Sequence, residues 1–318
     1  MAPRFDTDFD PRHGETVVVS PLLRRIVCRN PSKYTFHGTG TYIVGRGSVA
    51  VVDPGPDPAH DDAAAAHADA LLGAVADETV DAVLVTHTHG DHSPAAAHVA
   101  AATGAPVLGF GPHPRTATSE GDDDPAEDDD DTSPSAHPAD VDFRPDRRLA
   151  HGDVVTGPGW TIEALHTPGH ISNHLCFALR EESAVLSGDH VMGWSTTIIP
   201  PPDGDVGAYL RSLRLLLDRD DRVLYPTHGG AVTDPATFVR ALVDHRVERE
   251  HQIVGQLALG PRTVAEIVAV LYADVREELH RPAARSVLAH LLKLLHDERA
   301  RTVDDGPPLD DATRWMAG

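Results

Sequence analysis

Apolar positions in the first half of the chain form short runs that are separated by turn residues. Short runs rich in Val and Ile are typical of strands, whereas longer stretches with apolar residues at helical spacing favour helices. We therefore predict helices at 58–76 and 94–102 and strands at 16–19, 22–28, 41–44, 49–52, 81–85 and 105–109. Gly45 and Gly47 separate the third and fourth strands and predict a hairpin. Ser93 and Pro94 predict the N-cap and first residue of the second helix.

The second half of the chain repeats this order of elements. Its pattern predicts a helix at 206–217 and strands at 154–155, 160–165, 175–179, 184–186 and 223–225. Strands followed by a helix, occurring twice, predict an α/β fold in which two sheets are sandwiched between helices.

The pattern changes after residue 233 and predicts a separate, mostly helical tail. Asp234 and Pro235 open a long helix that reaches about residue 259, where Gly260 and Pro261 end it. A capping box at 263–266 opens a second helix, and Pro282 opens a third with leucines along one face. Residues 299–303 and Trp315 complete a small hairpin, and this is a winged-helix pattern. We therefore expect one α/β domain over 1–240 and a winged-helix domain over 241–318.

The formal net charge of −22 is unevenly distributed. Between Glu120 and Asp142 there are 11 acidic residues and no Lys or Arg, which leaves −22 − (−11) = −11 for the rest of the chain. This tract lacks apolar periodicity, so we interpret residues 119–142 as an acidic, disordered insertion. Residues 245–318 hold ten Lys or Arg against twelve Asp or Glu, and no basic stripe indicates nucleic-acid binding.

Features that report on the cellular compartment favour the cytoplasm. Cys28 and Cys176 form no CxxC motif, and we expect both to be buried thiols in a reducing environment. The first residues lack the apolar stretch of a signal peptide, and no apolar run is long enough to span a membrane.

Three histidines and an aspartate lie within six residues, in the loop after the predicted strand 81–85. The loop reads Thr86-His87-Thr88-His89-Gly90-Asp91-His92. Loops at the carboxyl ends of buried strands are where α/β folds place ligands. Divalent ions such as zinc bind imidazole nitrogen and carboxylate oxygen. The loop therefore predicts a metal site, and three later turns add His170, Asp189 and His228. Asp53 ends another strand and is expected to cap a turn or to support a ligand histidine.

These motifs resemble a known family. The segment 86–92, followed in order by His170, Asp189 and His228, resembles the metallo-β-lactamase superfamily of dinuclear metallohydrolases. Residues 30–42 are similar to the NPGxxTLxGTNTY motif of its lactamase-β-like branch, which includes the animal mitochondrial endoribonuclease. Further matches to this branch lie at 167–170, 187–189, 196–197 and 245–250. The resemblance covers roughly residues 16–318 and implies a four-layer αββα sandwich followed by a small winged helix.

The resemblance also implies a role for each candidate residue. One ion would bind His87, His89 and His170, the second would bind Asp91, His92 and His228, and Asp189 would bridge them. Asp91 and Asp189 are the implied catalytic residues, and two Zn²⁺ are the implied cofactors, with Mn²⁺ or Fe²⁺ as alternatives.

Several polar residues depart from this pattern or lie outside it. Gly40 stands where the branch usually has Asn, which puts an amide contact there in doubt. His190 follows Asp189 directly and either lines the pocket or is structural. We expect a structural role for His174, and surface or supporting positions for His37, His151 and His166.

The implied activity is hydrolysis of a small ester, thioester or lactone by a metal-bridging hydroxide. A metal-dependent endoribonuclease is the first alternative, although the acidic charge disfavours nucleic acid as a partner. A non-enzymatic winged-helix interaction protein and a mononuclear iron oxygenase are the others. We further expect the tail, residues 245–318, to shape or cover the active-site groove.

Overall fold

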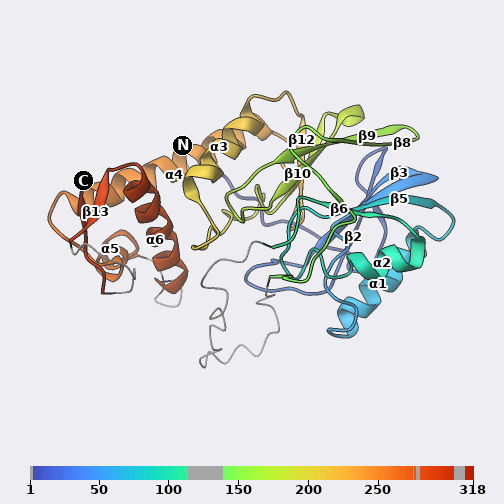
Figure 1. Ribbon diagram of the computed structural model, residues 1–318, viewed down its shortest axis with the longest axis horizontal. Coiled ribbons are helices and arrows are strands. Elements are labelled where there is room, and N and C mark those ends of the chain that lie inside the picture. The colour runs from blue at the N-terminus through green and yellow to red at the C-terminus, as the bar shows by residue number, and fades with distance from the viewer. Residues whose placement is uncertain (1–2, 114–138, 275, 277–279, 304–311) are drawn as a thin grey trace.

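Two β-sheets face each other in the centre of the molecule, and helices cover the outer side of each (Figure 1). The structure is a computed structural model that describes residues 3–113, 139–274, 276, 280–303 and 312–318. The predicted four-layer αββα sandwich with a small helical tail is confirmed.

The first sheet has seven strands in chain order. These are β1 Val17–Val18, β2 Leu23–Val27, β3 Gly40–Arg46, β4 Ser48–Val52, β5 Thr79–Leu84, β6 Val107–Gly109 and β7 Arg147–Arg148. The β3–β4 hairpin is antiparallel as predicted, whereas β4, β5, β6 and β7 run parallel.

The second sheet has five strands in the order β12-β11-β10-β9-β8. Their bounds are β8 Val154–Gly157, β9 Trp160–His166, β10 Leu175–Leu179, β11 Ala184–Gly188 and β12 Val223–Pro226. A short 3₁₀ turn, η1 Arg180–Glu182, joins β10 to β11, and β11 pairs with β12 in parallel.

Strand β10 shows how one strand serves two cores. Leu175, Phe177 and Leu179 join the cluster between the two sheets, while Cys176 and Ala178 join the cluster beneath the outer helices. Because successive side chains of a strand point to opposite faces, an unbroken apolar run is what a doubly covered strand requires. Cys28 and Cys176 are both buried free thiols, as predicted.

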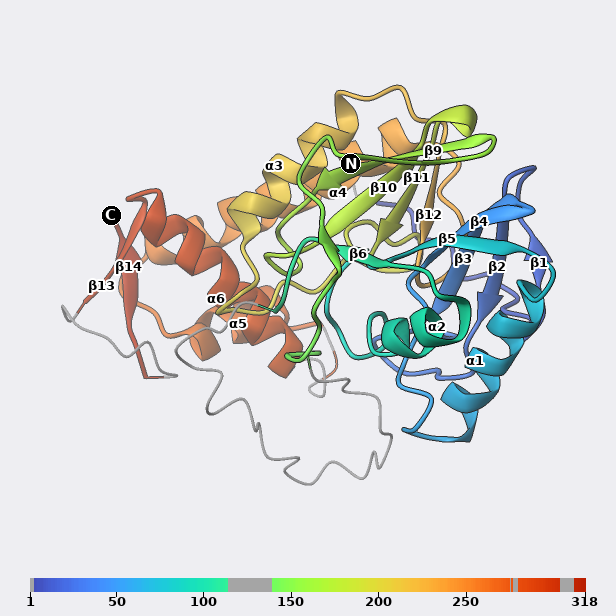
Figure 2. The ribbon, with the colours of Figure 1, turned by 45° about the vertical axis from the view of Figure 1, so that its right-hand side comes forward.

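Four helices form the two outer layers. α1 Asp62–Ala74 and α2 Ala96–Thr103 pack on the seven-stranded sheet, through a core that includes Leu71 and Val99. α3 Val206–Leu217 and the first part of α4 Pro235–Leu257 pack on the five-stranded sheet. Figure 2 shows α1 and α2 on the side of the sandwich away from α3 and α4.

The predicted cap of α2 is wrong. The helix begins at Ala96, and its N-cap Ala95 makes no side-chain capping bond. The Ser93 hydroxyl instead donates to Asp140 Oδ2 at 2.7 Å. A tertiary partner contributed from 47 residues away along the chain thus takes the place of the local cap.

The tail consists of the end of α4, the helices α5 Val264–Leu271 and α6 His280–His296, and the hairpin β13 Ala300–Thr302 and β14 Trp315–Ala317. The predicted capping box is present, since Thr263 and Glu266 bond each other's backbone N–H groups. Ile253, Ile267, Leu291 and Trp315 form part of its separate core. The boundary after residue 240 stays a prediction, because α4 continues through it.

Most of the acidic insertion, residues 119–138, lies outside the described residues, and so does the disorder predicted for it. Its last residues are described, and they contact the histidine loop. Within the described parts of the chain, no helix is long and apolar enough to cross a membrane.

Candidate metal centre

The histidine loop leaves β5 at the edge of the sheet where the parallel strands β4 and β5 both end. Asp53 follows β4 and accepts hydrogen bonds from the backbone N–H of Thr86 at 2.8 Å and from its hydroxyl at 2.7 Å. This carboxylate therefore ties the start of the histidine loop to the neighbouring strand. Asp53 has a φ of 50°, an uncommon conformation for a residue other than glycine.

All seven predicted site residues come together at this edge. Four of them, His87, His89, His170 and Asp189, place one ligand atom each within 4.8 Å of one another, and Asp91, His92 and His228 form a second such group. In the first group, His89 Nδ1 lies 2.9 Å from His87 Nε2 and 3.0 Å from His170 Nε2.

Asp189 belongs to the first group and also faces the histidines of the second. Its Oδ2 is 3.7 Å from His170 Nε2 and 3.6 Å from His92 Nε2, and its Oδ1 is 3.4 Å from His228 Nε2. Asp91 Oδ2 lies 3.4 Å from His92 Nε2 and 3.2 Å from His228 Nε2. Asp189 thus faces ligand atoms of both groups, whereas Asp91 faces the two histidines of the second group.

The histidines of the two groups have pKa values that are shifted in opposite directions. Burial, followed by neighbouring imidazoles, lowers the pKa of His87 far below its ordinary value and that of His89 to about 3. Burial also lowers the pKa of His170. Burial opposes the charge of His92 and His228 as well, but the adjacent carboxylates outweigh it and raise the pKa of His228 to about 10. These shifts favour the neutral form of the three histidines in the first group, the form in which imidazole binds a metal ion.

The donor set fits divalent metal ions. His89 Nδ1 lies at hydrogen-bond distance from His87 Nε2 and His170 Nε2, and three ring nitrogens that converge in this way can offer their lone pairs to one ion. In the second group, His92 Nε2 is buried and has no hydrogen-bond partner within the described residues, and the same holds for Asp189 Oδ1. Buried polar atoms of this kind are rare unless something else binds them. Imidazole and carboxylate are the ligands that zinc prefers.

Polar residues behind the ligands fix their orientation. Asp53 Oδ2 lies 2.9 Å from His92 Nδ1 and accepts from the Thr227 hydroxyl at 3.0 Å, so the supporting alternative predicted for Asp53 is the one observed. The Thr39 hydroxyl donates to Asp91 Oδ2 at 2.9 Å. His174 Nε2 accepts the backbone N–H of Asp189 at 3.2 Å, which gives this histidine a structural role.

Glycine is required next to His174. Gly188 has a φ of 52°, and a Cβ on it would lie 2.6 Å from His174 Nε2. A side chain here would therefore push apart the strand end that carries Asp189 and the histidine that holds it.

The outer side of the histidine loop is held by residues that sequence reasoning missed. The Asp140 backbone N–H donates to the Thr88 carbonyl at 2.7 Å, and Asn173 donates to the Thr88 hydroxyl at 2.8 Å. Asp140 also accepts from Ser93. Asp140 belongs to the acidic tract of the sequence, and nothing local distinguishes it there from the other acidic residues.

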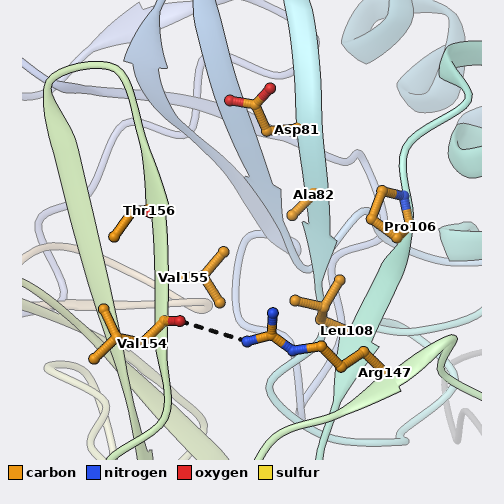
Figure 3. A pocket seen from close by; sticks show the side chains of 8 residues that line it. All are labelled: Asp81, Ala82, Pro106, Leu108, Arg147, Val154, Val155 and Thr156. Atoms are coloured by element: carbon orange, nitrogen blue, oxygen red, sulfur yellow. Dashed lines mark hydrogen bonds between the residues drawn. The ribbon is translucent and has the colours of Figure 1, made fainter.

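Five residues of the two groups line a cavity of about 220 Å³, namely His89, Asp91, His170, Asp189 and His228. Its walls come from Tyr34, Thr35, Met192, Ile198, Pro200 and, from the tail, Arg285. A second cavity of about 280 Å³ lies between the sheets, where Arg147 contacts the Val154 carbonyl (Figure 3). It contains none of the seven residues, so the smaller cavity is the candidate active site.

The models of two protein families match the chain. Residues 35–228 match the Metallo-beta-lactamase superfamily, and residues 263–315 match the Beta-lactamase associated winged helix domain. The chain belongs to the metallo-beta-lactamase superfamily. The first match contains all seven site residues, and the second lies within the tail.

Curated relatives and solved structures agree with this membership. An atrochrysone carboxyl ACP thioesterase of Aspergillus chevalieri is 31% identical over 88% of this chain and 83% of its own length. A beta-lactamase-like protein 2 homolog of Drosophila melanogaster is 30% identical, over 90% of this chain and 91% of its own. Together with the family, such relatives indicate that the chain is a hydrolase.

Two solved structures share the fold over both the sandwich and the tail. A beta-lactamase domain protein from Burkholderia ambifaria has a TM-score of 0.77 and 21% identity, covering 98% of this chain and 96% of that one. A metallo-beta-lactamase family protein from Thermus thermophilus has a TM-score of 0.72 and 24% identity, covering 95% and 100%.

In this member of the metallo-beta-lactamase superfamily, a buried arginine of α4 supports the loop beside His170. Arg246 is 6% exposed, and its Nη2 donates to the Thr197 carbonyl at 2.6 Å. The next carbonyl, that of Ile198, lies 2.6 Å from His170 Nδ1. This contact directs Nε2 of the same ring towards the first group. Arg246 belongs to the segment 245–250 that the resemblance singled out, but its contact could not be read from the sequence.

The other histidines singled out in the sequence do not line the cavity. His190 is fully buried and packs against the Tyr209 ring at 4.8 Å, so of the two predicted alternatives the structural one is observed. His166 binds the Ser172 carbonyl, His37 packs on Phe36, and His151 is exposed. Gly40 donates its backbone N–H to the Thr227 carbonyl, beside His228.

Proposed function

We propose that the chain is a dinuclear, zinc-dependent hydrolase of small acyl esters, with thioesters as the preferred class and lactones as further substrates. The observation that carries this proposal is a pair of donor groups that share Asp189 at the floor of one cavity. Imidazole and carboxylate favour zinc, and Mn²⁺ or Fe²⁺ are the alternative ions.

The two groups would divide the ions between them. One ion would be held by His87, His89 and His170, the other by Asp91, His92 and His228, and both by Asp189. When bound, such ions would lower the pKa of a water towards neutrality and would stabilise negative charge that develops on the substrate.

The protein's own residues orient this chemistry. Asp91 lines the cavity, and Thr39 holds one of its oxygens, so the carboxylate is fixed in a position to orient the attacking water. Asp189 is held through its backbone by His174. Met192, Ile198 and Pro200 provide an apolar wall that excludes water from the acyl group.

Charge and similarity favour a small acyl substrate over nucleic acid. The net charge of −22 and the balance of −2 in residues 245–318 offer phosphate backbones few cations, so little counterion release would favour binding. The Aspergillus chevalieri relative is named as a thioesterase, an enzyme class that hydrolyses thioesters. These observations favour the thioesterase over the endoribonuclease, the interaction protein and the iron oxygenase.

The proposal is tested by thiol release. The full chain, loaded with zinc, is mixed with butyryl-N-acetylcysteamine, a phenyl ester and a lactone, and thiol or acid release is followed. We expect the thioester to be hydrolysed fastest. Turnover should disappear on chelation and in Asp189→Ala, and it should persist in the control Asp81→Asn, whose side chain pairs with Ser48 away from the site. No hydrolysis of any of the three by the zinc-loaded chain would refute the proposal.

A further inference from the structure

One arginine of the tail lines the cavity of the sandwich. Arg285 lies on α6, whereas every other residue that lines the cavity comes from the N-terminal 228 residues. Among the lining residues it is the one Lys or Arg. The cavity therefore has a permanent cation at one side, while its floor is made of histidines and aspartates.

The position of Arg285 follows from the packing of α6. Ala289, one turn later on the same face of the helix, is buried in the core that α3 forms on the five-stranded sheet. This face of α6 is thus turned towards the sandwich, and Figures 1 and 2 show α6 as a tail helix lying alongside it. Buried contacts of α6 thus fix the backbone position of Arg285, and its side chain is exposed at the cavity.

Part of the cavity lining is apolar. Ile198 and Pro200 belong to the loop that precedes α3, and they offer apolar surface. Because Arg285 and the metal-ligand residues line the same cavity, a substrate bound at the metal groups can also contact the guanidinium. Guanidinium groups bind carboxylates and phosphates through paired hydrogen bonds.

We infer that Arg285 binds an anionic group, a carboxylate or a phosphate, on the acyl substrate of the proposed hydrolase. The inference rests on the proposed function and names its substrate class as anionic acyl thioesters or esters. A local cation also offsets the repulsion that a chain of net charge −22 exerts on an anion. The anion can lie on either part of the thioester, on the acyl chain or on the thiol that leaves.

Three thioesters test the inference and separate the two sources. Butyryl-N-acetylcysteamine is neutral, glutaryl-N-acetylcysteamine carries the anion on the acyl side, and butyryl-4′-phosphopantetheine carries it on the leaving side. For the zinc-loaded full chain and Arg285→Ala, kcat/KM is measured on each. We expect the ratio of one anionic substrate to the neutral one to fall about 10-fold, mainly through KM, because a charge-assisted contact is lost. The affected substrate identifies the side.

Two control variants fix the interpretation. Arg285→Lys should retain part of the preference, whereas Arg240→Ala, an exposed arginine of α4 outside the cavity, should leave the ratios unchanged. An unchanged ratio in Arg285→Ala, including an equal fall on all three substrates, would overturn the inference.

A binding measurement separates this inference from the proposed function. Calorimetry compares 4′-phosphopantetheine with pantetheine, and glutaramate with the neutral butyramide, on the wild-type chain and on Arg285→Ala. If the wild type hydrolyses none of the thioesters, the proposed function fails, while tighter binding of one anion that is lost in Arg285→Ala still supports the anion site. Equal binding of anionic and neutral probes would overturn it.

Discussion

Replacing Asp53 by asparagine should weaken one metal group and spare the other. In the wild type, Asp53 Oδ1 accepts from the Thr86 backbone, while Oδ2 faces the Thr86 hydroxyl, His92 Nδ1 and the Thr227 hydroxyl. Asparagine tolerates the φ of 50° at this position, so the backbone is preserved. The substitution therefore changes the charge and the hydrogen-bonding character of the side chain and leaves its size nearly the same.

The consequence falls on His92. An amide keeps one acceptor oxygen, which the Thr86 backbone N–H takes, and it turns an N–H₂ donor towards His92 Nδ1. The ring must then accept at Nδ1 and carry its proton on Nε2, the atom that faces Asp91 and Asp189. A protonated Nε2 cannot bind a metal ion.

Losses of such supporting contacts typically lower metal affinity about 10- to 100-fold, which corresponds to about 1.4–2.7 kcal/mol. We expect this loss at the ion held by Asp91, His92 and His228, with the first ion unchanged. Competition against a chromophoric chelator measures both affinities, and Asp81→Asn serves as the control. Equal weakening of both ions, or of neither, would refute the reasoning.

Four further predictions follow from the contacts of the site. Asp189→Ala should lower kcat more than ~100-fold with the fold retained by circular dichroism, because the carboxylate between the two groups is lost; near-wild-type turnover would exclude a bridging role. Arg246→Met should lower kcat/KM about 10-fold through the loop beside His170, since a charge-assisted bond of about 1.5–3 kcal/mol is removed, whereas Arg240→Met should not. Deletion of 119–138 should leave the metal stoichiometry unchanged, and unfolding of this variant would contradict the prediction. A deletion that extends through Asp140 should reduce turnover, because the hydrogen bonds of Asp140 to Thr88 and Ser93 are lost. Binding to single-stranded RNA should be weak with a shallow salt dependence, and tight, steeply salt-dependent binding would favour the endoribonuclease instead.

The fold was accessible from the sequence because its signals are local. Helix α3 was predicted with its observed bounds, since apolar residues at helical spacing mark the face that packs on the sheet. The capping box of α5 and the Asp234 cap of α4 also depend only on neighbouring residues. The cap of α2 failed because Ser93 has a tertiary partner, and no local pattern reports such a partner.

The candidate site was accessible for a different reason. His87, His89, Asp91 and His92 are compressed into one loop, and the later ligand-type residues each follow a strand, so topology gathers them at one edge. The residues that hold them could not be found in this way. Arg246 and Arg285 come from helices far along the chain, and arginines of that kind are common on helix surfaces.

The dependence of turnover on metal stoichiometry tests the central proposal most directly. The metal-free full chain is titrated with zinc while hydrolysis of butyryl-N-acetylcysteamine and bound metal are measured in the same samples. Two groups that share Asp189 predict that activity rises to its maximum at two zinc ions per chain and stays low at one. Full activity at one ion per chain, or activity that persists without metal, would contradict the two-metal hydrolase.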